Sequence, residues 1–206
     1  MSNGFLSEIP KDGSPYMKLQ KGENKFRIMS EPVKGYEWWL KENGEIKYEG
    51  DPAKGKEVKR AREDEPLSSE LAGATKFFWA FVVWNYATKK IEILELKQKT
   101  IMQAIQSLMK NKDWGSAIGT EGYDITITGI GDGMERRYPS TQPSPKKLLA
   151  PEIIKANNRA NIKLDALFDG DDPFKVGKEM KAEVKNETKK TEVSIEDFDT
   201  FINETK

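Results

Sequence analysis

Aromatic rings and cationic side chains are interleaved along several stretches of this sequence, and their types and spacing suit a binding chemistry. A flat ring can stack on a nucleobase, which contributes about 1–3 kcal/mol per base, and a cation can neutralise a phosphate. The pattern therefore favours a surface for single-stranded nucleic acid. The rings that we expect to stack on bases are Trp38, Trp39, Tyr48, Trp84, Tyr86 and Tyr138.

The alternative is that these rings belong to a hydrophobic core. We assign Trp79 and Phe81 to the core, because they lie in the middle of a strongly apolar run. For the pairs Trp38/Trp39 and Trp84/Tyr86 both interpretations stay open. Neighbouring side chains on a strand point to opposite faces, so one of the two adjacent tryptophans stays available for a ligand.

The cations that we expect to hold phosphates come from three parts of the sequence. They are Lys54, Lys56, Lys59, Arg60, Arg62, Lys76, Arg136 and Arg137. The basic run at 54–62 could form a flexible flap that clamps phosphates. Its alternative is a solvated loop whose charge is cancelled by the acids at 63–65.

The composition argues against most enzyme and metal chemistry. The 206 residues include no cysteine and no histidine, so the commonest general base, thiolate nucleophiles and the commonest metal ligands are missing. The acids at 169–172 lack the spacing of a calcium loop, and no glycine-rich run matches a phosphate loop. We expect a binding protein rather than an enzyme, with no catalytic residue, no metal ion and no cofactor.

Charge and hydropathy indicate a soluble protein of the cytoplasm. The chain carries 34 basic and 34 acidic residues, and residues 1–175 have a slight basic excess of 28 to 26. The first fifteen residues are polar and broken by prolines, unlike a signal peptide. No apolar run approaches the length needed to cross a membrane.

A predicted hairpin with strands at 77–86 and 91–96 is the centre of the expected fold, because its first strand is apolar on both faces. Further strands are expected at 25–29, 35–40 and 46–48, the last two joined by a turn at Asn43-Gly44. From 50 to 75 the pattern dissolves into a long loop with basic and then acidic residues.

A helix is expected at 101–110, with a capping box formed by Thr100 and Gln103. Strands follow at 123–127 and 135–138, and one or two helices lie between 149 and 167. We therefore predict a mainly β domain with helices, a five-stranded OB-fold barrel with one inserted helix and a C-terminal helical segment. An SH3-like barrel or a small sandwich would give a similar pattern.

The expected organisation has three parts. Residues 1–15 form a flexible N-terminal arm, residues 16–168 form the OB-fold domain that binds single-stranded DNA, and residues 169–206 form a flexible, disordered tail with an acidic end.

Blocks of the sequence resemble the single-stranded DNA-binding proteins encoded by tailed bacteriophages. The similarity covers about residues 14–150, and the order and spacing of the blocks carry it. The blocks are Tyr16-Met17-Lys18-Leu19, Gly22, Asn24, Phe26-Arg27-Ile28, Phe78-Trp79-Ala80-Phe81-Val82-Val83, Ile93-Leu94-Glu95, Trp114-Gly115, Tyr123-Asp124-Ile125-Thr126-Ile127, Tyr138 and Pro143.

The resemblance implies an OB-fold that coats and protects single-stranded DNA during phage replication, recombination and repair, without marked sequence preference. It also implies an acidic tail that recruits replication and recombination proteins and competes with DNA. The tail residues that match this role are Glu196, Asp197, Phe198, Asp199 and Phe201. Some members of the family carry zinc, for which this chain has no cysteine or histidine, and lysines dilute its tail.

Two other functions fit the same pattern. A recombination mediator or strand-annealing protein would use the fold to pair complementary strands, and a protein-interaction module would use the aromatic face to bind protein. The sequence does not indicate the oligomeric state.

Overall fold

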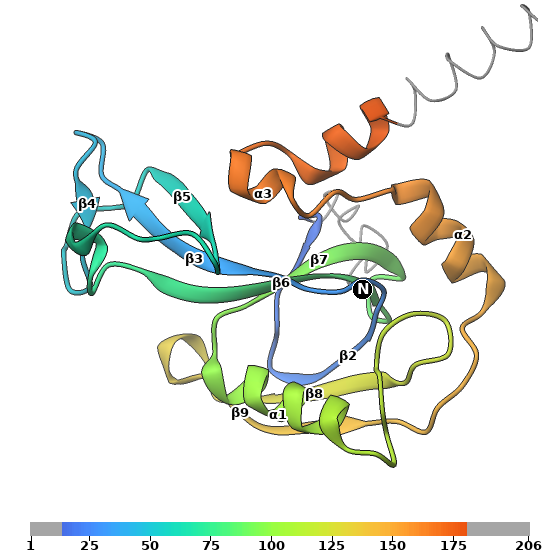
Figure 1. Ribbon diagram of the computed structural model, residues 1–206. Coiled ribbons are helices and arrows are strands. Elements are labelled where there is room, and N and C mark those ends of the chain that lie inside the picture. The colour runs from blue at the N-terminus through green and yellow to red at the C-terminus, as the bar shows by residue number, and fades with distance from the viewer. Residues whose placement is uncertain (1–13, 181–206) are drawn as a thin grey trace, which may run out of the picture.

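The computed structural model describes residues 14–180, and the strand β6 (Lys76–Asn85) is its central element. β6 pairs antiparallel with β3 (Val33–Leu40), β2 (Gly22–Ile28) and β7 (Lys90–Leu96). These strands confirm the expected hairpin and the expected strands before it. The described part is a mixed α/β structure made mainly of strands (Figure 1).

The main ladder runs in the order β1-β7-β6-β2-β8-β9. β1 (Tyr16–Met17) lies parallel to β7, while β8 (Asp124–Ile130) and β9 (Arg137–Pro143) are antiparallel to their neighbours. The helix α1 (Lys99–Lys110) connects β7 to β8. It begins before Thr100, with Gln98 as N-cap and no side-chain cap bond, so the predicted capping box is wrong.

An extension that we call the wing (residues 36–75) projects from this ladder (Figure 1). Beyond β6, β3 pairs with β4 (Ile46–Lys47) and β5 (Glu57–Arg62). The predicted turn between β3 and β4 is confirmed: Gly44 has a φ of 85°, and the Lys41 amide donates to the Glu45 carbonyl oxygen at 2.8 Å.

The expected loop at 50–75 is wrong in part, because it contains β5 and a short 3-10 helix, Ser69–Leu71. The backbone of β5 pairs with β3 from Glu57 to Arg62. Side chains along β5 alternate between exposed and partly buried, but the inward ones include Arg60 and Arg62. Long basic side chains bury their aliphatic stems while carrying charge, and this hid the strand pattern.

The inner face of β6 belongs to the main core. Phe81 packs there with apolar residues of β2, β7 and β8 and with the buried face of α1, including Ile105. Trp79 is half-buried against the same cluster, so the assignment of Trp79 and Phe81 to the core is confirmed.

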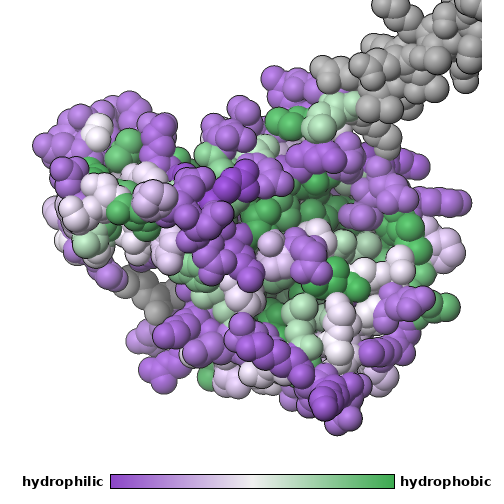
Figure 2. Space-filling model, in the orientation of Figure 1, coloured by the Kyte–Doolittle hydropathy of each residue, from purple (hydrophilic) through white to green (hydrophobic). Residues whose placement is uncertain are grey.

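The outer face of β6 is covered by what we call the C-terminal segment (residues 162–180). It follows α2 (Pro151–Ala160) and contains α3 (Ala166–Asp169) and a helical stretch at 173–180. Leu164 and Leu167 pack on Phe78 of β6. Apolar side chains gather between this segment and the sheet, whereas the wing is mostly hydrophilic (Figure 2).

An ion pair and a ring contact attach the C-terminal segment to the wing. Arg62 Nη1 lies 2.6 Å from Asp165 Oδ1, and its guanidinium lies 4.5 Å from the Phe168 ring centroid. The predicted tail therefore begins too early at 169, because the apolar outer face of β6 requires a cover that continues past this point. The predicted tail residues from 196 to 201 and the arm at 1–13 lie outside the described residues.

Within residues 14–180, no helix has the length and apolar character needed to cross a membrane.

The packing of Leu167 predicts a large loss of stability on truncation. Leu167 is 4% exposed, so Leu167→Ala should lower the free energy of unfolding by about 2–5 kcal/mol through lost burial and a residual cavity. Leu148 is 77% exposed and is the control, so Leu148→Ala should change the free energy of unfolding by less than about 0.5 kcal/mol. Urea denaturation measures both, and equal midpoints for the two variants would mean that the C-terminal segment does not cover β6.

Candidate nucleic-acid interface

Two exposed rings and three lysines meet in a hollow at the base of the wing, here called the wing hollow. Trp39 is 40% exposed and Tyr48 44% exposed, and both line it. Lys47, Lys76 and Lys97 line it as well, together with Glu37 and Glu49. The structure thus brings together three of the predicted residues, Trp39, Tyr48 and Lys76.

The two rings are held in place by the backbone around them. The Tyr48 hydroxyl donates to the Glu70 carbonyl oxygen at 2.7 Å. Gly55 lies so close to Trp39 that an added Cβ would come within 2.8 Å of the indole Cε3 atom. Rings held in this way lose little conformational freedom when a base stacks on them.

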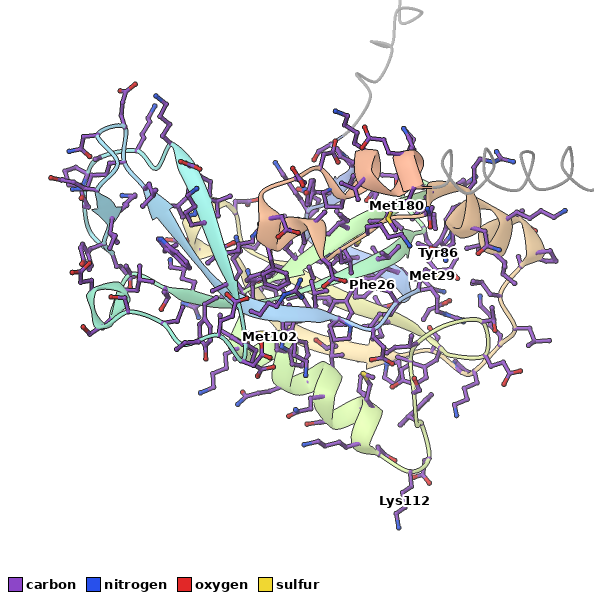
Figure 3. The ribbon with its side chains drawn as sticks, turned by 45° about the horizontal axis from the view of Figure 1, so that its top comes forward. Phe26, Met29, Tyr86, Met102, Lys112 and Met180 are labelled. Carbon is purple, nitrogen blue, oxygen red and sulfur yellow. The ribbon has the colours of Figure 1, made fainter. Side chains whose placement is uncertain are left out.

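A second hollow, the helix hollow, lies between the start of β6 and α1. Its apolar lining consists of Phe77, Trp79 and Met102, and it shares Lys76 and Lys97 with the wing hollow. Met102 lies near the start of α1, close to the junction of the wing with the rest of the molecule (Figure 3). The two hollows therefore form neighbouring parts of one surface.

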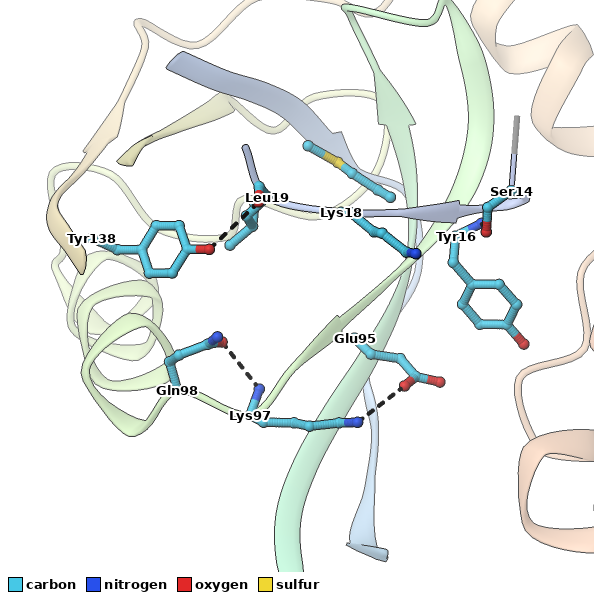
Figure 4. Close-up of a pocket in the computed structure, with 9 residues that line it drawn as sticks. Ser14, Tyr16, Lys18, Leu19, Glu95, Lys97, Gln98 and Tyr138 are labelled. Atoms are coloured by element: carbon cyan, nitrogen blue, oxygen red, sulfur yellow. Dashed lines mark hydrogen bonds and ion pairs between the residues drawn. The ribbon is translucent and has the colours of Figure 1, made fainter. Parts of the chain in front are cut away.

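A third hollow lies where β1 approaches β9, and Lys97 lines it too (Figure 4). It contains Tyr16, Lys18 and Tyr138, and the Tyr138 hydroxyl lies 3.5 Å from the Leu19 carbonyl oxygen. We call the three hollows around Lys97 the Lys97 groove. Each of the three hollows is lined by at least one aromatic ring and by lysines.

Two acids within the groove are neutralised by two bases. Lys97 Nζ lies 2.6 Å from Glu37 Oε1, and Arg60 Nη2 lies 2.8 Å from Glu95 Oε1 and 3.6 Å from Glu37 Oε2. Glu37 is only 2% exposed, and a buried carboxylate requires such partners. With these two acids paired, Glu49 remains against Lys18, Lys47, Lys76 and Lys99, so the groove has a positive excess.

The flexible flap predicted at 54–62 is wrong in part, because residues 57–62 form β5; phosphate binding by its exposed lysines stays a prediction. Arg60 is held in this ion-pair cluster over the Phe78 ring, and Arg62 is bound to Asp165. Lys56 and Lys59 are exposed cations that pair with Glu42 and Glu57. Lys54 is exposed in the connection before β5. The basic run thus lies in β5 or just before it, and four of its five cations pair with acids.

The other predicted cations and rings are dispersed. Trp38 is half-buried on the face of β3 opposite Trp39. Arg136 Nη1 donates to the Leu19 carbonyl oxygen at 3.1 Å, a structural contact between β9 and the chain after β1. Arg137 is exposed on β9.

Trp84 and Tyr86 lie at the opposite end of β6 from the wing, with ring centroids 6.5 Å apart (Figure 3). The Tyr86 hydroxyl donates to Asp124 Oδ1 at 2.8 Å. Asp124 and Arg27 are fully buried, and Arg27 Nε donates to the same oxygen at 2.9 Å. This end of β6 carries ion pairs around the buried Asp124, here called the Asp124 cluster, and lies apart from the Lys97 groove.

The pKa values in this cluster follow from burial and neighbouring charges. Burial, with the hydrogen bond to Asp124 adding to it, raises the pKa of Tyr86 to about 12. Burial alone would raise the pKa of the Asp124 carboxyl, but the Tyr86 hydroxyl, Arg27 and the nearby lysines outweigh it and hold that pKa below its usual value. Lys25 and Lys147 each lie 3.3 Å from Asp124 Oδ2.

Sequence reasoning missed the residue that joins the three hollows, Lys97, together with Lys18 and Lys99 nearby. One available signal was the antiparallel pairing of the hairpin. It places the residue after the end of β7 beside the start of β6, where Lys76 was already a candidate.

No protein-family model matches this chain, and no curated protein matches it. Within residues 14–180, no group of three or more acidic side chains is arranged to hold a metal ion.

The raised pKa of Tyr86 predicts a loss of stability in alkali. The unfolded chain loses the phenolic proton near pH 10.0, while the folded chain keeps it until about pH 12, so the free energy of unfolding should fall across this interval. Urea denaturation at stepped pH should show a smaller fall for Tyr86→Phe, which has no phenolic proton. Equal falls in the two proteins would contradict the contact between Tyr86 and Asp124.

Proposed function

We propose that this chain binds single-stranded DNA through the Lys97 groove, without marked sequence preference. The observation that carries the proposal is the wing hollow, where Trp39 and Tyr48 are exposed beside Lys47, Lys76 and Lys97. Bases of any type can stack on exposed rings, and lysines can neutralise the phosphates between them. In a duplex the flat faces of the bases are stacked on neighbouring base pairs and are not accessible to the rings, so the arrangement favours a single strand.

The strand order supports the inference of an OB-fold. β2, β6 and β7, then α1, then β8 and β9 follow one another as in a five-stranded OB barrel with a helix before its last two strands. The wing then occupies the connection between the first two barrel strands, which in OB-folds contributes to oligonucleotide binding. The ladder does not pair β9 with β7, but Leu19 next to β1 accepts a hydrogen bond from Arg136 beside β9.

The biological role that we infer is coating and protection of single-stranded DNA during phage replication, recombination and repair, in the cytoplasm of the host. It is supported by the resemblance of residues 14–150 to phage single-stranded DNA-binding proteins. On the same basis, the acidic end of the chain is proposed to recruit replication and recombination proteins.

A fluorescence titration tests the proposal. Trp39 lies in the wing hollow, so an oligo-dT strand should quench tryptophan fluorescence at low salt, and its affinity should fall steeply as salt rises. A duplex of the same length should bind more weakly. A protein-interaction module would leave the fluorescence unchanged, which would overturn the proposal. A strand-annealing protein would also accelerate pairing of complementary oligonucleotides.

Two exposed lysines provide a matched pair for this titration. Lys76 lines two of the hollows, whereas Lys112 lies past the far end of α1 (Figure 3). Lys76→Ala should weaken oligo-dT binding and reduce the slope of log affinity against log salt by about 0.7, one phosphate contact on a single strand. Lys112→Ala should leave both quantities at their wild-type values. The same slope in the two variants would place the DNA elsewhere.

A further inference from the structure

The helix hollow has a different character from the other parts of the Lys97 groove. Its volume is about 480 Å³, and its apolar lining is formed by Phe77, Trp79 and Met102. Sites for small flat ligands have volumes of about 300–1,000 Å³ and apolar walls with a few polar groups. Its polar lining consists of three lysines and two glutamines, and no described residue that lines it is acidic.

The apolar walls are held from behind by other side chains. The Phe77 ring lies 5.3 Å from Tyr36, and the Trp79 ring contacts Phe81 edge-on at 6.0 Å. Met102 is 7% exposed, and its unbranched side chain can adjust to the shape of a ligand. The hollow is therefore already formed before anything binds.

The rim of the hollow determines which kind of ligand fits. Lys76, Lys97 and Lys99 surround the apolar floor, and the first two also border the wing hollow with its exposed rings. Lys97 already pairs with Glu37, but an apolar peptide segment would bring no anion to Lys76 and Lys99. A strand of nucleic acid supplies both a flat apolar base for the floor and phosphates for the rim.

We infer that the helix hollow takes one nucleobase of the bound strand, turned out from its neighbours and packed between the Phe77 and Trp79 rings and Met102. The inference rests on the proposed function and adds a subsite to it. The amides of Gln103 and Gln106 line the hollow and offer both donors and acceptors to the edge of the base. The subsite therefore accepts every base and selects for a strand that is not paired.

An abasic scan tests the subsite. The probe is the shortest oligo-dT strand that binds with full affinity, because such a strand cannot slide, and each nucleotide in turn is replaced by an abasic residue that keeps its phosphate. Loss of the inserted base should weaken binding by about 5–150-fold, the range for one stacked base. The variant Gln103→Trp places a ring over the hollow from an exposed position. It should bind the intact strand as weakly as wild type binds the strand that lacks the inserted base.

The same variant identifies the inserted nucleotide. In Gln103→Trp, an abasic residue at the nucleotide that enters the helix hollow should cause no further loss of affinity. Abasic residues at nucleotides that stack in the wing hollow should still weaken binding as they do in wild type. Ser107→Trp, exposed on the same helix but outside the hollow, is the control and should match wild type.

Two results would overturn the subsite. One is that Gln103→Trp binds the intact strand as tightly as wild type does. The other is that every abasic residue that weakens binding to wild type weakens binding to Gln103→Trp by the same factor. In either case salt-dependent quenching would remain, so the proposed function would stand. Absence of any oligonucleotide binding would instead overturn the proposed function and the subsite together.

Discussion

The central constraint on this structure is that β6 carries apolar side chains on both faces, so both must be covered. The inner face, with Phe81, forms the main core with β2, β7, β8 and α1. The outer face, with Phe78, is covered by the C-terminal segment through Leu164 and Leu167. A strand buried on both faces cannot offer its middle to a ligand, so any binding surface must lie at its ends.

The two ends of β6 differ in how their charges are satisfied. At the Tyr86 end, Arg27 and the Tyr86 hydroxyl are bound to the buried Asp124, and this network fixes the sheet. At the Lys76 end, Arg60 and Lys97 neutralise the acids of the groove, and the remaining lysines border exposed rings. The lysines at the Tyr86 end are bound to Asp124, whereas Lys76 borders exposed rings, so the Lys76 end is the better suited to attract a polyanion and stack its bases.

Local patterns predicted much of the fold but less of the site. The hairpin around β6, the turn at Gly44 and the core position of Phe81 follow from periodicity and turn chemistry. β5 was missed because two of its partly buried side chains, Arg60 and Arg62, are arginines with acidic partners on other elements. Lys97 was missed because its role arises where three elements meet, and no local pattern encodes such a meeting.

The most direct test of the account is a map of backbone amide chemical shifts with and without an oligo-dT strand. If the Lys97 groove binds the strand, the largest changes will lie at 37–39, 47–48, 76–79 and 97–103. The amides at 84–86 and 124, in the Asp124 cluster, will change little. A map centred on the Tyr86 end, or one without changes at saturating oligonucleotide, would contradict the account.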